Sequence, residues 1–263
     1  MSKVFLISDV HVNYAANWKW LSEISGHEND ILLVAGDVSH DISELARCLQ
    51  MLVAKFKHVF YTPGNHDVWV MDDDKQDSIS KMEHVLKICE HAGVKTRPEF
   101  LENIWIVPLF SWYDSTFAIS EPLTKNDIEE LKGWSDLHFC KWPKGFKPRD
   151  MYERNEDFIQ SFDLMDASPI ISFSHMLPRR DLLPPRAELE HKFLAHVVGS
   201  TLLESQIKRL GSTVHGFGHS HVNKDVVIDG VRYVQNAMGY PKERERYSYT
   251  PRLKQIWPLE EGE

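Results

Sequence analysis

Short apolar runs, many of them rich in β-branched residues, alternate along this chain with stretches that have the spacing of amphipathic helices. The runs have the length of strands, which separates them from helices. Strands are predicted at residues 4–7, 31–35, 58–61, 104–107, 169–173, 213–217, 225–228 and 231–234, and helices at 18–24, 42–56, 78–91, 152–165 and 202–210. Because parallel strands need long crossover connections, the alternation predicts an α/β fold with a largely parallel sheet.

Polar clusters stand directly after five of these predicted strands. In chain order they are Asp9-Val10-His11, Gly36-Asp37, Gly64-Asn65-His66-Asp67, Ser174-His175 and Gly218-His219-Ser220-His221. Loops at the carboxyl ends of strands in an open α/β sheet meet in one crevice. Each cluster alone is more often a polar turn than a ligand site. Together, at strand ends, they predict a single pocket of metal-binding side chains.

The donor atoms of this pocket are carboxylates, imidazoles and one amide, without a thiolate. Such a set suits Mn, Fe or Zn in a reactive centre rather than a cysteine-rich structural zinc site. Two ions held side by side need a shared ligand, and a carboxylate is the side chain best suited to bridge them. The pattern offers Asp37 for this role.

The five clusters together resemble the signature of the calcineurin-like metallophosphoesterase superfamily, and no ligand of that signature is missing between residues 9 and 221. The resemblance implies a four-layer αββα sandwich with two divalent metal ions, Mn²⁺ foremost and Fe or Zn²⁺ as alternatives. The implied ligands of the first ion are Asp9, His11, Asp37 and His221. The implied ligands of the second ion are Asp37, Asn65, His175 and His219.

The resemblance also implies a catalytic role for His66, beside the leaving-group oxygen, as a proton donor or a stabiliser of the transition state. Asp67 is placed with it as a residue that orients its neighbours, although it could equally cap the following helix. Two divalent ions roughly 3.5–4 Å apart clamp both sides of an in-line displacement and lower the pKa of a bound water. The expected reaction is therefore hydrolysis of a phosphomonoester or phosphodiester with a small organic leaving group, by a metal-bridging hydroxide.

Three alternative functions remain open at this point. A nuclease would need a basic surface, whereas the formal net charge is -9. A non-catalytic binding or scaffold protein of the same fold is disfavoured by the complete ligand set. A protein Ser/Thr phosphatase needs an open groove, which a lid rich in tryptophan opposes.

The lid is the stretch of residues 111–149, which is rich in Trp, Pro and charge and has weak periodicity. We interpret it as an insertion in a single domain that spans residues 1–263. Trp112 and Tyr113 open this stretch and are candidates for substrate contact or for plain packing. Arg179, or its neighbour Arg180, follows a predicted metal ligand, so it could fork onto a phosphate oxygen or pair with surface carboxylates. Tyr240 is a weaker candidate at the rim.

The cysteine count and the opening residues bear on location. Three dispersed cysteines fit a reducing compartment, and Met1-Ser2-Lys3 leads directly into a strand without a secretory signal. No apolar run has membrane-spanning length. We expect a cytoplasmic enzyme with a small phosphorylated substrate, without a membrane or nucleic acid partner. The sequence carries no signal for its oligomeric state.

Overall fold

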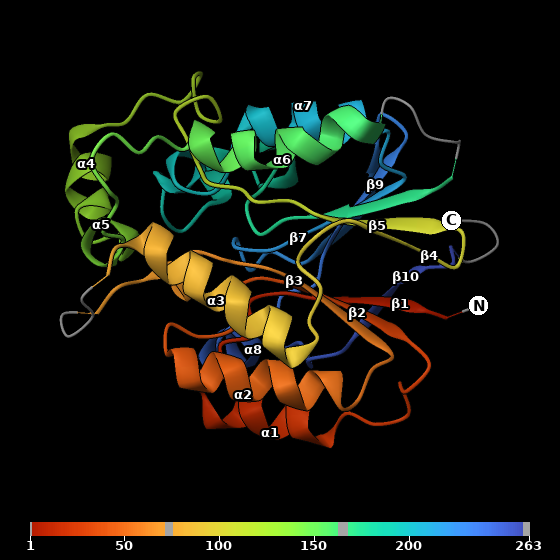
Figure 1. The fold of residues 1–263 in the computed structure, drawn as a ribbon. Helices are drawn as coiled ribbons and strands as arrows, with labels where there is room; N and C mark the ends of the chain where they lie inside the picture. The colour runs from red at the N-terminus through yellow and green to blue at the C-terminus, as the bar shows by residue number, and fades with distance from the viewer. Residues whose placement is uncertain (1, 72–75, 163–167, 260–263) are drawn as a thin grey trace.

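Two β-sheets lie face to face at the centre of the molecule (Figure 1). The computed structural model describes residues 2–71, 76–162 and 168–259. The first sheet has the strand order β10-β1-β2-β3, with β1 at Val4–Ile7, β2 at Ile31–Ala35, β3 at His58–Thr62 and β10 at Lys254–Trp257. The second has the order β4-β5-β6-β7-β9-β8, with β4 at Glu99–Leu101, β5 at Ile104–Pro108, β6 at Ile170–Phe173, β7 at Val214–Phe217, β8 at Lys224–Ile228 and β9 at Val231–Gln235.

The central strands of both sheets are parallel, as the alternation of strands and helices predicts. In the first sheet β1, β2 and β3 pair in parallel, and only β10 is antiparallel. In the second sheet β5, β6, β7 and β9 pair in parallel, between the antiparallel edge strands β4 and β8. Strands β8 and β9 form a hairpin through Asp229 and Gly230, both with positive φ, which is the conformation of a type I′ turn.

Side chains on alternate positions of each strand fill two different layers. Val4 and Leu6 of β1 point into a buried core shared by both sheets, where they meet Ile171 and Phe173 of β6. The alternate residues Phe5 and Ile7 pack on the opposite side, within the cluster that also holds residues of the flanking helices. Because strand side chains alternate between faces, this pattern requires apolar cover on both sides of each sheet.

Helices supply that cover on both outer faces (Figure 1). Helices α1 (Ala15–Glu23), α2 (Ile42–Val53) and α3 (Ser78–Ala92) lie against the first sheet, and α6 (Arg149–Phe162) and α7 (Thr201–Leu210) against the second. The predicted four-layer αββα sandwich is therefore confirmed. Helix α2 begins at its predicted cap, since Asp41 accepts a hydrogen bond of 2.9 Å from the backbone N–H of Glu44.

Several short elements were not predicted from the sequence. They are β4, β10, α4 (Lys125–Leu131), α5 (Asp136–Phe139), α8 (Pro241–Tyr247) and the 3₁₀ helices His66–Val68, Arg180–Leu182, Arg186–Glu188 and Leu194–His196. Helix α8 carries charge around its surface and lacks the apolar spacing of a core helix. Pro241 at its first turn is the signal that could have found it. The predicted helix 152–165 starts earlier, at Arg149, and its last predicted residues, 163–165, lie outside the described residues.

Helices α4 and α5 belong to the predicted lid and lie at one end of the sandwich, at the left in Figure 1. Backbone hydrogen bonds tie this stretch to residues before and at the start of α3, from the N–H of Val70 to Phe139 O at 2.8 Å and from the N–H of Ser78 to Lys141 O at 2.9 Å. In residues 2–71, 76–162 and 168–259, no helix has both the length and the apolar content needed to cross a bilayer.

His215 is a fully buried histidine of β7 that lies outside the predicted clusters. Its Nδ1 lies 2.8 Å from Ser172 Oγ and its Nε2 lies 3.0 Å from Ser174 Oγ, without a carboxylate partner in the bonds described. Burial lowers the pKa of His215 from 6.5 to about 3. Between pH 6.5 and about 3, His215 takes up a proton in the unfolded chain but not in the folded chain. The free energy of unfolding therefore falls as the pH falls through this range.

We expect the substitution His215→Gln to flatten the acid dependence of stability. The slope of the unfolding free energy between pH 6.5 and about 3 should decrease by up to about 1.4 kcal/mol per pH unit. Urea unfolding of the wild type and the variant, with a chelator present, measures the two slopes. Parallel slopes would show that His215 is protonated in the folded protein.

Candidate metal centre

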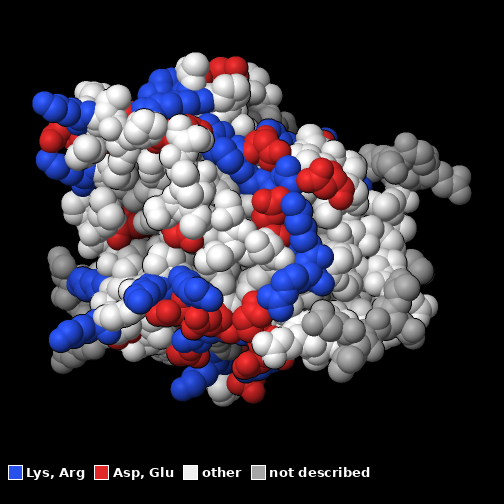
Figure 2. Space-filling view, turned by 90° about the horizontal axis from the view of Figure 1, so that it is seen from above, with Lys and Arg blue, Asp and Glu red and all other residues white. Residues whose placement is uncertain are grey.

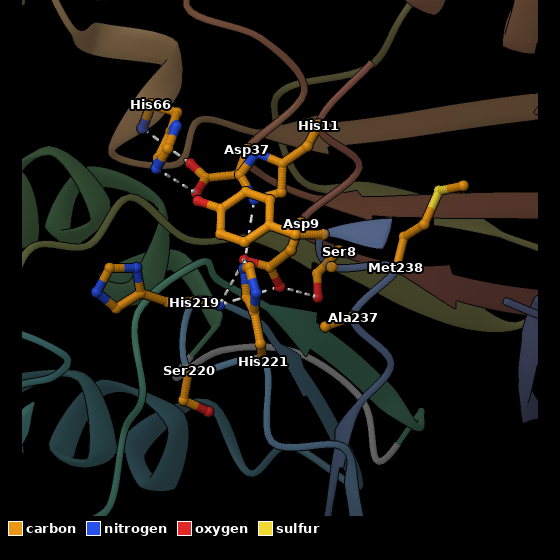
Figure 3. Close-up of polar contacts among 12 residues, drawn as sticks. Ser8, Asp9, His11, Asp37, His66, His219, Ser220, His221, Ala237 and Met238 are labelled. Carbon is orange, nitrogen blue, oxygen red and sulfur yellow. Dashed lines mark hydrogen bonds and ion pairs between the residues drawn. The ribbon is translucent and has the colours of Figure 1, made fainter. Parts of the chain in front are cut away.

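All five polar clusters meet at the carboxyl ends of strands from both sheets. Asp9 and His11 follow β1, Asp37 follows β2 and Asn65 follows β3, whereas His175 follows β6 and the pair His219 and His221 follows β7. Figure 3 shows Asp9, Asp37, His66 and His221 with their side chains directed toward one another. The predicted ligands, which are remote in sequence, thus lie in one place between the two sheets.

The loops that carry these side chains have an unusual backbone. Five residues other than glycine adopt a positive φ at the centre, namely Asp9 (52°), His11 (43°), Asp37 (56°), His219 (73°) and His221 (54°). Such a conformation costs about 1–3 kcal/mol per residue and persists only where the surroundings impose it. Here the loops hold one another, because the N–H of Asp9 donates to Gly36 O (3.1 Å) and that of His11 to Asp37 O (2.9 Å).

Glycine is required where the second and third loops touch. A Cβ on Gly64 would lie 2.1 Å from Asp37 Oδ1, and a Cβ on Gly36 would lie 2.6 Å from the backbone N of Gly64. A side chain at position 64 would displace Asp37, and one at position 36 would force the two loops apart. The glycines of these two clusters therefore allow the close approach that brings Asp37 toward both groups of histidines.

The first group of donor atoms comes from Asp9, His11 and His221. His221 Nδ1 lies 2.7 Å from Glu243 Oε2, so this nitrogen carries the proton and Nε2 faces inward. His221 Nε2 lies 3.2 Å from Asp9 Oδ1 and 3.3 Å from His11 Nε2. Asp9 is itself fixed by the N–H of His219, at 2.9 Å from Oδ1. These three side chains could hold one cation.

The second group comes from Asp37, Asn65, His175 and His219. His175 Nδ1 donates to Ala35 O at 2.9 Å, and His219 Nε2 donates to Val197 O at 2.9 Å. Asn65 Nδ2 donates to Asp136 Oδ1 at 2.8 Å. The atoms left facing inward are acceptors: His175 Nε2 lies 2.9 Å from Asn65 Oδ1 and 3.2 Å from His219 Nδ1. Converging lone pairs of this kind fit a bound cation.

Asp37 lies between the two groups. Its Oδ1 is 3.4 Å from His175 Nε2 in the second group, and its carboxylate also clusters with His11 of the first group and with His66. Asp37 is nearly fully buried, and burial raises its pKa. A buried carboxylate that reaches both groups is suited to be shared by two cations.

The electrostatic field of the centre attracts positive charge. Burial alone would lower the pKa of His221 and of His175, but Asp9 raises the pKa of His221 to about 10, and Asp37 raises that of His175 to about 9. In each ring the other nitrogen is already engaged as a donor, so the extra proton sits on the nitrogen that faces the centre. A metal ion would displace these protons, as expected for imidazole ligands.

His66 lies beside the donor atoms and lines the adjoining cavity. Its backbone N–H donates to Asp37 Oδ1 at 2.9 Å, and its ring stacks on Trp69 with centroids 3.6 Å apart. Burial, followed by repulsion from His11 and His221, lowers its pKa well below 6.5. The ring is thus held at the edge of the centre, with a nitrogen 3.8 Å from Asp37 Oδ2.

Asp67 lies behind the centre and is fully buried. Its Oδ1 accepts from the N–H groups of Val38 and Ser39, and its Oδ2 accepts from the N–H of Asp37 and of Gly64 and from the hydroxyl of Tyr61, all at 2.8–3.0 Å. The sequence left two roles open for Asp67, orienting its neighbours or capping the following helix. The geometry favours the orienting role, because the hydrogen bonds described for the carboxylate go to loop N–H groups and to Tyr61. Asp67 fixes the loop that carries Asp37 rather than facing the cavity.

We expect Asp67→Asn to lower the free energy of unfolding by about 1–3 kcal/mol, because an amide NH₂ would face backbone donors. Urea unfolding in the presence of a chelator measures this loss. Asp41→Asn is the matched control, since asparagine caps a helix about as well as aspartate. A variant that is inactive but as stable as the wild type would instead assign Asp67 to the reaction.

The predicted substrate residues are placed differently. Arg179 forms ion pairs of 2.7–2.8 Å with Asp181, Glu204 and Asp229, and it does not line the cavity. Arg180 pairs with Glu121. Of the two uses considered for these arginines, their positions favour pairing with carboxylates, because carboxylates bind both guanidinium groups.

The two aromatic candidates also lie outside the cavity lining. Trp112 is buried and packs against Trp142, with ring centroids 4.7 Å apart. Tyr113 stacks on Trp112 and lies parallel to the ring of His219 at 6.5 Å. Of the two uses considered for these residues, their positions favour packing within the lid.

A cavity of about 830 Å³ adjoins the centre. Its walls come from the metal-binding loops, the lid, the segment 184–194 and the C-terminal segment, and include Asp37, Asn65, His66, Trp69, Trp134, Asp136, Leu189, Leu194, His219, His221, Tyr240, Glu243, Tyr247 and Tyr249. The weak candidate Tyr240 stacks on His11 with centroids 4.5 Å apart. Four lining residues were not predicted from the sequence because none of them stands in a motif, namely Trp69, Trp134, Asp136 and Glu243.

Comparison with known families decides which class of protein this site belongs to. The model of the calcineurin-like phosphoesterases matches residues 2–223. The chain belongs to this family. As a calcineurin-like phosphoesterase it is a metal-dependent hydrolase of phosphoester bonds, so the predicted enzyme class is confirmed. Tyr240 and Glu243 lie beyond the matched residues.

One sequence relative and two solved structures are similar to this chain over most of its length. The phosphoesterase is 25% identical, over an alignment of 275 positions covering 97% of this chain and 83% of the relative, to the [acyl-carrier-protein] phosphodiesterase PptH of Mycobacterium tuberculosis. It is similar to the crystal structure of the phosphopantetheinyl hydrolase PptH from that bacterium, with a TM-score of 0.82 at 23% identity over 100% of this chain and 98% of that chain. A further solved structure gives a TM-score of 0.56 at 14% identity, covering 96% and 98% of the two chains. These likenesses establish the fold.

Proposed function

We propose that this phosphoesterase binds two divalent ions and hydrolyses a phosphodiester that joins a phosphopantetheinyl group to an acyl carrier protein. The proposal is supported by the PptH sequence relative, which covers 97% of this chain. It is supported equally by the metal centre, in which inward-facing acceptor atoms form two groups that share Asp37. The observation that carries the substrate assignment is the PptH sequence relative, and the cavity of about 830 Å³ beside the metal centre is large enough for a substrate longer than a phosphate group.

The assignment of ligands follows the two groups of donor atoms. Asp9, His11, Asp37 and His221 would hold one ion, and Asp37, Asn65, His175 and His219 the other. When bound, the ions supply an activated water and neutralise charge on the phosphoryl oxygens. Mn²⁺ is our first choice, although Fe and Zn²⁺ accept the same donors.

The protein's own residues position the phosphodiester and the proton. Oxygen from water forms a bond to phosphorus, the bond from phosphorus to one ester oxygen breaks, and a proton passes to that oxygen. His66, at the edge of the centre, would donate a hydrogen bond or the proton to the departing oxygen. Trp69, stacked beneath it, holds the imidazole in place.

The volume of the cavity favours a long substrate over a small phosphoester. Its volume of about 830 Å³ lies in the upper part of the range of ligand pockets, far beyond the needs of a phosphate group. Trp134, Leu189 and Leu194 contribute apolar surface to its wall. Such a wall can take the long phosphopantetheinyl chain, which widens the earlier expectation of a small substrate.

A nucleic acid substrate is less well supported. On the face covered by α6 and α7, Lys and Arg are interspersed with Asp and Glu (Figure 2). Arg209 pairs with Glu156 and Lys208 with Glu204 on these helices. A face of mixed charge lacks the basic stripe that binds a polyanion.

The proposal also covers the domain organisation of the protein and its location in the cell. We propose that residues 1–263 form one domain, in which residues 111–149 act as a lid over the cavity. Cys48, Cys89 and Cys140 are free thiols. This agrees with a cytoplasmic location, where a carrier protein substrate would be met.

The substrate is tested by incubating the Mn²⁺-loaded enzyme with a holo acyl carrier protein and following the loss of the phosphopantetheinyl group by intact-mass spectrometry. We expect kcat/KM for this substrate to exceed that for bis(p-nitrophenyl) phosphate by about 100-fold, which corresponds to about 2.7 kcal/mol of additional binding in the transition state. Asp37→Asn, treated identically, is the inactive control. Turnover of the small diester with an unchanged carrier protein would reject the substrate and leave the phosphoesterase activity in place.

The role of His66 is tested with His66→Ala. We expect kcat to fall by about 10²–10⁴-fold, since this is the usual contribution of a positioned acid. The loss should be larger for a poor leaving group than for p-nitrophenolate, while metal content by atomic emission stays at the wild-type value. Full turnover of an ester with a poor leaving group would eliminate this role.

A further inference from the structure

Asp136 is a lid residue whose carboxylate is buried against the metal centre. It begins α5 and is 2% exposed, although the neighbouring lid residues Leu137 and His138 are exposed. Its Oδ1 accepts a hydrogen bond of 2.8 Å from Asn65 Nδ2 and one of 2.6 Å from Trp69 Nε1. Its Oδ2 accepts one of 3.0 Å from Trp134 Nε1. One carboxylate thus gathers donors from the metal-binding loop, the following 3₁₀ turn and the lid.

The contact with Asn65 decides which end of the amide faces the centre. An amide can rotate so that its oxygen and nitrogen exchange places, and only the oxygen can bind a cation. With Nδ2 held by Asp136, Oδ1 points toward His175 Nε2 at 2.9 Å. Without the carboxylate, this hydrogen bond no longer opposes the rotated amide, whose NH₂ would face the cation.

The contact with Trp69 reaches a second part of the centre. The indole ring of Trp69 stacks on His66 with centroids 3.6 Å apart and an interplanar angle of 28°. Because Asp136 accepts a hydrogen bond from the indole N–H, it fixes the orientation of the indole ring on which His66 stacks. The same lid residue therefore supports a metal ligand and the neighbouring imidazole.

We propose that Asp136 is a positioning residue through which the lid sets the orientation of the Asn65 amide, and with it the affinity of the metal site formed by Asp37, Asn65, His175 and His219. This inference rests on the proposed ligand role of Asn65 and is independent of the identity of the substrate.

The alternative is that Asp136 merely holds the lid together. Asp127 provides the matched comparison, because it is another lid carboxylate, 3% exposed, at the start of α4. Asp127 accepts hydrogen bonds from Thr124 and pairs with Arg186, so its described partners lie outside the donor groups of the centre. A general loss of lid structure should affect both substitutions alike.

Mn²⁺ binding to the metal-free protein, measured by calorimetry and by electron paramagnetic resonance, separates these explanations. We expect Asp136→Ala to weaken one of the two Mn²⁺ sites by about 10–100-fold, the usual effect of removing a group that orients a ligand. The other site should keep its wild-type affinity. Asp127→Ala should keep both affinities, and circular dichroism verifies that each variant is folded.

A double-mutant cycle with Asn65→Ala tests whether Asp136 changes the Mn²⁺ affinity through Asn65. If Asp136 acts through Asn65, Asp136→Ala should cause no further loss of affinity in a protein that already carries Asn65→Ala. Additive losses, equal weakening of both sites, or an equal loss in Asp127→Ala would each overturn the inference. Unchanged Mn²⁺ binding in Asn65→Ala alone would reject the ligand role itself, which is a separate failure from a silent Asp136→Ala.

Discussion

The convergence of acceptor atoms between the two sheets is the constraint on which the rest of this molecule depends. Hydrogen bonds to Ala35 O, Val197 O and Glu243 occupy the outer nitrogen of three histidines and direct the inner nitrogen toward buried carboxylates. Burying carboxylates and lone pairs together is unfavourable unless a cation or protons lie among them. Binding of divalent ions therefore relieves an electrostatic conflict that the fold itself creates.

The two sheets share this centre, which explains why strained backbone is tolerated there. Loops from β1, β2 and β3 meet loops from β6 and β7, and each loop is held by a strand whose register is fixed by its neighbours. Asp67 shows the same principle, because one carboxylate binds N–H groups of the second and third loops. Ligand geometry is thus a property of the whole sandwich.

The sequence predicted the parts of the site that are encoded locally. A polar residue directly after a buried strand can be recognised from the strand pattern, and this pattern predicted the central strands and the candidate ligands that the structure brings together. Asp136 and Glu243 carry no such signal, since their roles arise from contacts 71 and 22 residues away. The sequence left two uses open for Arg179 for a related reason, because proximity in sequence to His175 does not decide where a long side chain points.

The pairing of the first strand with the end of the chain has a consequence for biosynthesis. Strand β1 pairs with β10, and Ser8 bonds to Asn236 and Met238 on the same side. Strand β1 is synthesised before its partner β10, so this edge of the first sheet is covered only after residues 236–257 have been made. Until then the nascent sheet exposes an apolar edge strand, which is prone to intermolecular pairing.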